Sequence, residues 1–218
     1  MRENVADAAR ICARMGLVEA FGHVSARLPE GGFLITATRP LLGASAAEVL
    51  QLSDEGEIVS GEVELLPLET PLHTAIYASR PDVGALCRTH SPHAVAWGAR
   101  SAVPPLVLGL DGLSGEIALH DDTDLVVDIA AGAAAASSMG DADCLLIRAN
   151  GNICSGGSLS EAVVRAWFLE LRSANAARTG EAAPLEGEQL ARRSRHYDVE
   201  LVRAWRWCRA QFGDGGQL

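Results

Sequence analysis

The residues most capable of chemistry lie in one stretch, 66–97, which reads LPLETPLHTAIYASRPDVGALCRTHSPHAVAW. Glu69 and His73 are four residues apart, a spacing that puts both side chains on one face of a helix. Arg88 and His90 are two apart, which puts both on one face of a short strand. A carboxylate, two imidazoles and a guanidinium can therefore converge, for acid/base work, for metal binding or for holding an anion.

The elements that position these residues follow from proline and glycine. Pro67 and Pro71 bracket Glu69 and predict a helix start there, and Pro81 predicts its end after Arg80. The residues from 85 to 90 then predict a strand. The opening stretch is therefore a helix, a turn and a strand.

Further elements are predicted from apolar spacing and capping residues on both sides of this stretch. Strands are expected within 21–28, 31–40 and 144–157, with a hairpin turn at 54–57 and irregular short strands and loops over 102–120. Helices are expected over 3–15, from Ser45 and Glu48 through Leu50, from Thr123 or Asp124 to Gly140, from Ser158 and Glu161 onward, and over 188–212. Residues 175–188 are polar and predict an exposed connection.

Composition restricts the class of protein. With 218 residues and 48% apolar residues, one substantial core and a single domain over 1–218 are expected. The formal net charge of −10 disfavours nucleic acid and membrane surfaces as partners. No long apolar run suggests a leader or a membrane span, which predicts a cytoplasmic protein. The five cysteines are widely spaced and predict buried free thiols.

The order of motifs resembles the class II aldolase/adducin family over about residues 3–175. The resemblance rests on GHVSAR at 22–27, LITATRP at 34–40, the Glu69–His73 helix, RTHSPHA at 88–94 and RANGNICSGG at 148–157. It implies an α/β fold, a three-layer α/β/α domain with a central, largely antiparallel sheet. It also implies a homotetramer with sites at subunit interfaces.

The family's sugar-phosphate aldolases hold a divalent metal with three histidines, and this implies where such a metal would sit. His90 matches the second histidine, while Arg88 and Asn150 stand in place of the first and third. A guanidinium has no lone pair to offer and a neutral amide is a weak ligand, so a family-type zinc site is not expected. A rebuilt site would use His90 with His73, Glu69 or His93.

The resemblance also implies roles for other residues. Glu69 matches the family's acid/base glutamate and is expected to exchange the proton at carbon. His90 is expected to act with Arg88 as a catalytic group that positions the substrate carboxylate and stabilises developing negative charge. Ser25 and Arg27 lie in a motif that supports the site, and the Thr38 backbone lies where the family contacts ligand. Two further assignments are less direct. Asn150 is expected either to orient substrate or to form a left-handed turn before Gly151. Tyr197 is expected to contact a neighbouring subunit.

Arg88 is the most informative single residue, because a buried guanidinium must be paired. It is expected to grip a carboxylate or enolate of the substrate, and the alternative is a structural ion pair with Glu69 or Asp82. His73 is expected to be a core histidine. The helix over 188–212 is expected either to dock on another subunit or to cover its own core. The tail 213–218 is expected to fray.

These observations predict a lyase acting on a C–C bond of a non-phosphorylated carboxylate, most plausibly a decarboxylase. Pro67 and Leu68 stand where the family's phosphate-binding enzymes have small hydroxyl residues, which disfavours sugar phosphates. RTHSP and NG resemble the family branch of small-molecule decarboxylases such as those acting on 3,4-dihydroxyphthalate. The alternatives are a metal-dependent aldolase with a rebuilt metal site and a non-catalytic, adducin-like assembly or binding protein.

Overall fold

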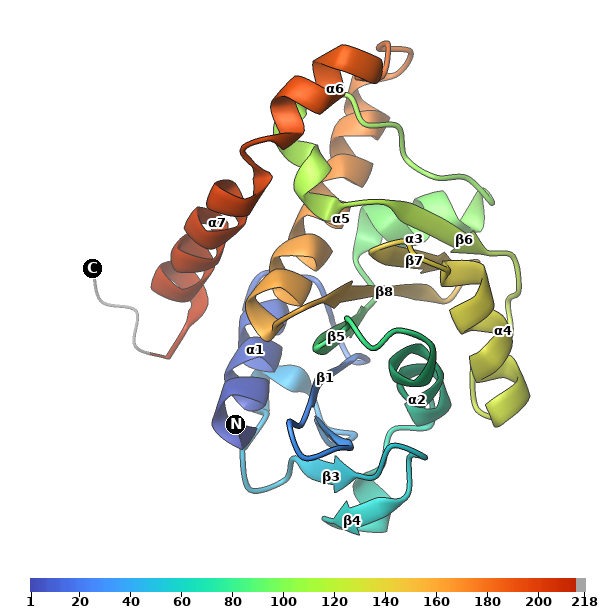
Figure 1. Ribbon diagram of the computed structural model, residues 1–218, viewed down its shortest axis with the longest axis vertical. Helices are drawn as coiled ribbons and strands as arrows, with labels where there is room; N and C mark the ends of the chain where they lie inside the picture. The colour runs from blue at the N-terminus through green and yellow to red at the C-terminus, as the bar shows by residue number, and fades with distance from the viewer. Residues whose placement is uncertain (215–218) are drawn as a thin grey trace.

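One eight-stranded sheet organises the chain (Figure 1). The computed structural model describes residues 1–214. The strand order is β4-β3-β2-β1-β5-β8-β7-β6, and every neighbouring pair is antiparallel except the parallel pair β6 and β7. The strands are β1 His23–Arg27, β2 Phe33–Ile35, β3 Leu50–Leu52, β4 Ile58–Ser60, β5 Ala85–Thr89, β6 Ile117–His120, β7 Cys144–Ile147 and β8 Gly151–Gly156.

Helices cover both faces of this sheet, which gives three layers (Figure 1). α1, α3, α5 and α7 pack on one side, and α2 and α4 pack on the other. Short 3-10 helices lie at Leu41–Gly43, Val63–Leu65 and Gly109–Ser114. The helices are α1 Arg2–Arg14, α2 Thr70–Ser79, α3 Pro92–Ala99, α4 Ile129–Met139, α5 Leu159–Thr179, α6 Gly187–Ser194 and α7 Tyr197–Phe212. The predicted α/β/α fold with a largely antiparallel sheet is confirmed.

Local capping explains where two helices begin. The Ser158 side chain accepts the N–H of Glu161 at the start of α5, as its motif predicts. The predicted start of α4 at Thr123 or Asp124 is too early. The helix begins at Ile129, and the Asp128 side chain accepts the N–H of Ala131 in its first turn.

The predicted helix from Ser45 through Leu50 is not formed. The Ser45 hydroxyl accepts the N–H of Ala47 in a turn, and the chain then enters β3 at Leu50. The capping pattern does not produce a helix here, because residues 50–52 form β3 and pair with β2. The sequence also missed α3, which begins at Pro92 directly after the predicted strand.

The C-terminal part differs from the prediction in two ways, and the contacts of the last helix favour one of the two roles expected for it. α5 runs to Thr179, so the exposed connection is shorter than 175–188. The terminal helix is divided into α6 and α7. α7 packs on α1 and α5 of its own chain, where Trp207 stacks on Trp167 with ring centroids 4.7 Å apart. Its apolar face therefore covers its own core, and residues 215–218 of the predicted frayed tail lie outside the described residues.

Successive side chains of β5 point to opposite faces of the sheet and so belong to two different hydrophobic cores. Leu86 faces the α2 and α4 layer, whereas Cys87 faces α1 and α5. Cys87 pairs in register with Cys154, which pairs with Cys144, and the two sulfur atoms of that second pair are 3.1 Å apart. All five cysteines are buried free thiols, as predicted. Within residues 1–214, no helix has the length and apolar character needed to cross a bilayer.

Candidate functional site

Glu69 lies at the N-terminal end of α2, where Pro71 in the first turn sets the helix entry. The residue as a whole is 7% exposed. Its Oε2 is 3.0 Å from Nη2 of Arg88, and its Oε1 accepts hydrogen bonds from Arg88 at 3.3 Å, from the amide of Asn150 at 3.2 Å and from the Val126 N–H at 3.4 Å. Four segments distant in sequence therefore meet at this carboxylate.

Arg88 is the partner that makes this burial possible. The side chain is fully buried, and it pairs with Glu69 instead of Asp82, which binds Arg80. Its remaining contacts are carbonyl oxygens of Thr89 and the β7–β8 turn. Of the two kinds of partner expected for Arg88, the structure therefore shows the ion pair with Glu69. The predicted grip on a substrate carboxylate stays a prediction.

The turn between β7 and β8 leaves room for this guanidinium. Gly151 has a φ of +99°, and a Cβ there would lie 2.3 Å from Nη1 of Arg88. The other left-handed residue is Ala149, with a φ of +55°, so Asn150 is not the left-handed residue of the turn. This favours the side-chain role among the two expected for Asn150, because its amide donates to Glu69.

His23 and His90 lie beside the ion pair. His23 Nε2 is 3.8 Å from Glu69 Oε2, and His90 Nδ1 is 3.2 Å from the carbonyl oxygen of Phe21. The Phe21 ring, which is exposed, meets the His90 ring edge-on with centroids 6.4 Å apart. His90 is only partly buried, so of the two predicted catalytic groups beside Arg88 it is the more accessible.

Burial and the Arg88 charge keep the imidazoles neutral. Burial lowers the pKa of His90, the nearby Arg88 lowers it further, and hydrogen bonding to Phe21 opposes these effects. Burial likewise lowers the pKa of His23 well below its usual value, with contributions from His73 and Arg88. The pKa of Arg88 is itself lowered by burial, against the charge of Glu69. Both histidines are therefore hydrogen-bonding groups without charge.

Four other predicted residues lie apart from Glu69. Ser25 is fully buried and bonds His73 and Tyr77. The Arg27 guanidinium donates to three carbonyl oxygens at the end of α2 and before β5. Thr38 is exposed, and its N–H donates to the Leu65 carbonyl, so its backbone donor is already used. These residues support α2 and the sheet instead of lining the cluster.

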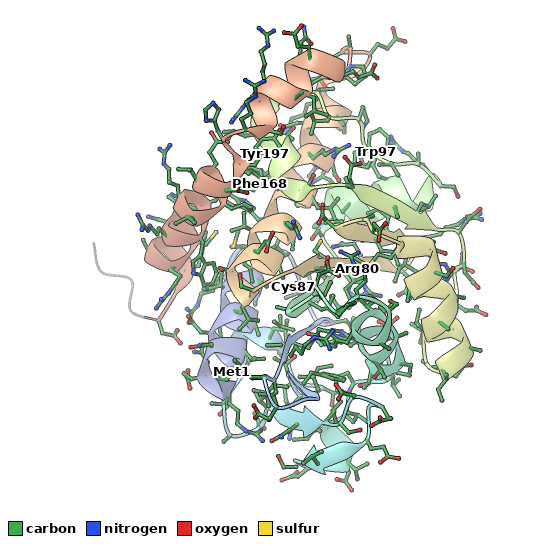
Figure 2. The ribbon with its side chains drawn as sticks, viewed as in Figure 1. Met1, Arg80, Cys87, Trp97, Phe168 and Tyr197 are labelled. Atoms are coloured by element: carbon green, nitrogen blue, oxygen red, sulfur yellow. The ribbon has the colours of Figure 1, made fainter. Side chains whose placement is uncertain are left out.

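Tyr197 is the fourth of them. Figure 2 shows Tyr197 well above Cys87, the neighbour of Arg88 on β5. Its hydroxyl donates to the Gly109 carbonyl at 2.9 Å within the same chain. The predicted contact of Tyr197 with a neighbouring subunit stays a prediction, but within its own chain the hydroxyl is already bonded.

The residues at these positions do not fit the three-histidine metal centre of the family's sugar-phosphate aldolases. Arg88 offers only donors, and the Asn150 amide nitrogen is turned toward Glu69. Nδ1 of His93 lies 2.6 Å from Glu170, so that imidazole is used elsewhere. Over the part of the chain that the structure describes, no group of three or more His, Cys, Asp and Glu side chains is placed to hold a metal ion.

A groove in the surface lies apart from this cluster. A groove of about 780 Å³ runs between α2 and α4, with Arg80 and Asp141 at one end. Thr70 and Pro71 line it, but Glu69, Arg88 and His90 do not. The Glu69 cluster therefore does not line this groove. Of the two, the cluster is the stronger candidate for a functional site because it contains the buried ion pair.

Sequence reasoning missed two contributors to the cluster. In the sequence, His23 is a polar residue of the GHVSAR motif. It shares one face of the strand predicted within 21–28 with Ser25 and Arg27, and this polar face was the available signal. The Val126 N–H carries no side-chain signature, because any residue in that loop supplies the same donor.

Comparisons with known proteins agree with the geometry. The model of the class II aldolase and adducin N-terminal domain matches residues 3–175. A 3,4-dihydroxyphthalate decarboxylase from Terrabacter sp. (strain DBF63) is 33% identical over 209 residues, covering 87% of each chain. Another 3,4-dihydroxyphthalate decarboxylase, from Arthrobacter keyseri, is 31% identical over 182 residues and covers 76% of this chain and 73% of its own.

The fold has a close structural counterpart. A crystal structure of an aldolase II superfamily protein from Pseudomonas syringae superposes with a TM-score of 0.81 at 22% identity, covering 97% of this chain and 91% of that one. At that identity the similarity concerns the fold alone.

Proposed function

This chain belongs to the class II aldolase and adducin N-terminal domain family, and from this premise we propose that it decarboxylates a non-phosphorylated hydroxyaromatic acid. It is a carbon–carbon lyase of that family, with decarboxylases among its relatives. The two related 3,4-dihydroxyphthalate decarboxylases support the reaction, since each exceeds 30% identity over more than two thirds of this chain.

The observation that carries the proposal is the buried Glu69–Arg88 ion pair. Loss of carbon dioxide from a hydroxyaromatic acid needs a proton on the ring carbon that carries the carboxylate. Glu69 takes the proton of the substrate hydroxyl and delivers it to that carbon, while the ring oxygen becomes a keto group. The C–C bond then breaks, carbon dioxide leaves, and the electron pair of that bond returns to the ring, which becomes an aromatic phenolate and takes a proton from water. Arg88 holds the Glu69 carboxylate in position for both transfers.

The neighbouring groups divide the remaining work. His90 is neutral, partly exposed and within the same cluster, so it can hydrogen-bond an oxygen of the substrate. The Asn150 amide and the Val126 N–H fix the other carboxylate oxygen of Glu69. Arg88 is thus a positioning residue, and preorganisation of this kind lowers the barrier without moving charge during the reaction.

The entrance to α2 supports a substrate without phosphate. Pro67 and Leu68 have no side-chain donor, and Leu68 is 73% exposed. The hydroxyl of Thr70 is already donated to the Pro67 carbonyl at 2.6 Å. No side-chain hydroxyl of this segment is therefore free to bind a phosphoryl oxygen.

We also propose that the chain forms a homotetramer, as its family resemblance implies. Exposed apolar side chains near the cluster support a covering partner: Phe21, Leu68, Leu125, Val127 and Ile129. Sedimentation equilibrium of the purified chain tests this, and a monomer at micromolar concentration would contradict it. A cytoplasmic location stays a prediction from the sequence.

The experiment measures two products: carbon dioxide released from the acids, and the aldehyde formed by aldol cleavage of the sugar phosphates. The purified protein is incubated with 3,4-dihydroxyphthalate and, in parallel, with a panel of monohydroxylated aromatic acids and ketose 1-phosphates. We expect decarboxylation of an aromatic acid, and Glu69→Gln should lower kcat by about 10²- to 10⁴-fold. Glu64→Gln, an exposed control on the preceding segment, should leave the rate unchanged. Cleavage of the sugar phosphates alone, or an active Glu69→Gln variant, would refute the proposal.

A further inference from the structure

A continuous row of side chains leads from the core to the cluster. The Tyr77 hydroxyl is 2.8 Å from the Ser25 hydroxyl, which is 2.7 Å from Nδ1 of His73. His73 Nε2 is in turn 2.7 Å from Nδ1 of His23. The last atom of the row, His23 Nε2, lies 3.8 Å from Oε2 of Glu69. None of the four residues of this row, Tyr77, Ser25, His73 and His23, belongs to the acid/base machinery proposed above.

Each contact in this row needs one donor and one acceptor, and each hydroxyl has a single hydrogen to donate. A neutral imidazole carries a hydrogen on one nitrogen only. If His73 donates from Nε2, then His23 accepts at Nδ1 and carries its own hydrogen on Nε2. If the direction is reversed, His23 donates from Nδ1 and its Nε2 is bare.

The two ends of the row decide between these directions. If His73 instead donates from Nδ1 to Ser25, then Ser25 either donates to the Tyr77 oxygen or accepts from both neighbours. In the first case the Tyr77 hydrogen, and in the second the Ser25 hydrogen, has no acceptor within residues 1–214. Both hydroxyls are buried, so either arrangement leaves a buried donor without a partner. In the same direction the bare Nε2 of His23 would face the Glu69 carboxylate, lone pair against lone pair. Both ends therefore favour a row that donates from Tyr77 toward His23.

The ionisation of these groups agrees with a neutral row. Burial lowers the pKa of His73 to about 3, with a further contribution from Arg88. Burial raises the pKa of Tyr77 well above its usual value, so that its hydroxyl stays a donor. The Arg27 guanidinium lies 4.7 Å from the centre of the Tyr77 ring and holds that ring in place.

We infer that His23 is a fixed hydrogen-bond donor to substrate, its Nε2–H directed beside Glu69 by the row Tyr77–Ser25–His73. The separation of 3.8 Å from Glu69 exceeds a direct hydrogen bond, so the N–H can be donated to an oxygen placed next to the carboxylate. The oxygen that fits is an anionic one, a substrate carboxylate or the phenolate-like oxygen that gains charge as carbon dioxide leaves. This role rests on the proposed function, whereas the tautomer itself does not.

Nitrogen-15 NMR of histidine-labelled protein tests the tautomer without any substrate. Long-range coupling spectra distinguish a protonated ring nitrogen from a bare one. We expect His23 and His73 both to carry hydrogen on Nε2. Ser25→Ala should interrupt the row and give a mixture of tautomers at His73, while Ser173→Ala, a buried serine outside the row, should not. A bare Nε2 on His23 in the unaltered protein would overturn the inference.

Substrate binding tests the donor role. Addition of 3,4-dihydroxyphthalate should shift the His23 Nε2–H resonance, and His23→Ala should raise the dissociation constant about tenfold. His23→Gln should restore part of this loss, because its amide can place an N–H near the Nε2 position, whereas His23→Asn should not. Equal binding by all three variants would refute the donor role. If the acid binds and shifts His23 but is never decarboxylated, the proposed function fails and the donor role stands.

Discussion

Breaking the Glu69–Arg88 pair from one side should be among the most destabilising changes available to this chain. In Arg88→Met the side-chain volume is largely kept, but the carboxylate of Glu69, a residue that is 7% exposed as a whole, loses its countercharge. Carbonyl oxygens of Thr89, Asn150 and Asn152 lose a charged donor at the same time. Removing one partner of a buried pair costs about 3–5 kcal/mol, so the unfolding free energy should fall by about 4 kcal/mol.

The measurement is urea unfolding followed by circular dichroism at one fixed protein concentration, because assembly would otherwise shift the midpoint. For a chain of this size, a loss of about 4 kcal/mol corresponds to a melting temperature lower by about 8–16 °C. Arg148→Met is the matched control, because the Arg148–Asp121 pair, 3.0 Å apart, is exposed on both sides. It should cost less than about 1 kcal/mol.

A double variant isolates the pair itself. In Arg88→Met with Glu69→Gln the uncompensated charge is gone, so the double variant should recover about 1–3 kcal/mol relative to the sum of the two single changes. Strict additivity, or a loss below about 1 kcal/mol for Arg88→Met, would refute the view that Arg88 exists to balance Glu69. The carbonyl contacts would then have to account for its burial.

Further predictions concern pH and backbone geometry. Because the pKa of His73 is about 3 in the folded chain and 6.5 in the unfolded one, its stabilising contribution is complete above pH 6.5 and is lost as the pH falls toward 3. At pH 5 the unfolding free energy should be lower by about 2 kcal/mol than at pH 7.5 because of His73 alone. The urea midpoints at pH 7.5 and pH 5 should therefore differ less for His73→Gln than for the parent. Gly151→Ala should cost about 3 kcal/mol or more, because its Cβ would meet Arg88 at 2.3 Å in a left-handed turn. Gly180→Ala, also left-handed but with nothing within 4 Å, should cost about 1 kcal/mol, and equal midpoints for the two variants would contradict the steric reasoning.

The sequence predicts the elements that carry Glu69 and Arg88 because their signals are local. Prolines before and within the first turn mark the start of α2, and three consecutive apolar residues, 85–87, precede the arginine in β5. The three-layer fold, by contrast, was inferred from the resemblance. No local pattern states that β1 lies between β2 and β5, because sheet order depends on contacts distant in sequence.

The role of Arg88 could not be predicted for a related reason. From the sequence a substrate carboxylate and the Glu69 carboxylate are equally good partners for a buried guanidinium. The choice depends on the distance between two segments 19 residues apart and on the space left by Gly151. His23 was underestimated because its importance lies in its contact with His73, which the polar face of β1 alone does not reveal.

The cysteines of the opposite core have a practical consequence. All five thiols are buried. A hydrogen bond with Cys12, together with burial, raises the pKa of Cys87, and burial raises the pKa of Cys154 and of Cys208. The thiolate form that reacts with alkylating reagents is therefore scarce in the folded chain. Modification therefore requires the helices over that face to separate from the sheet. The thiols are therefore a built-in probe of the separation of these helices from the sheet. Their rate of alkylation at several temperatures would measure the rate of that separation without any introduced dye or tag.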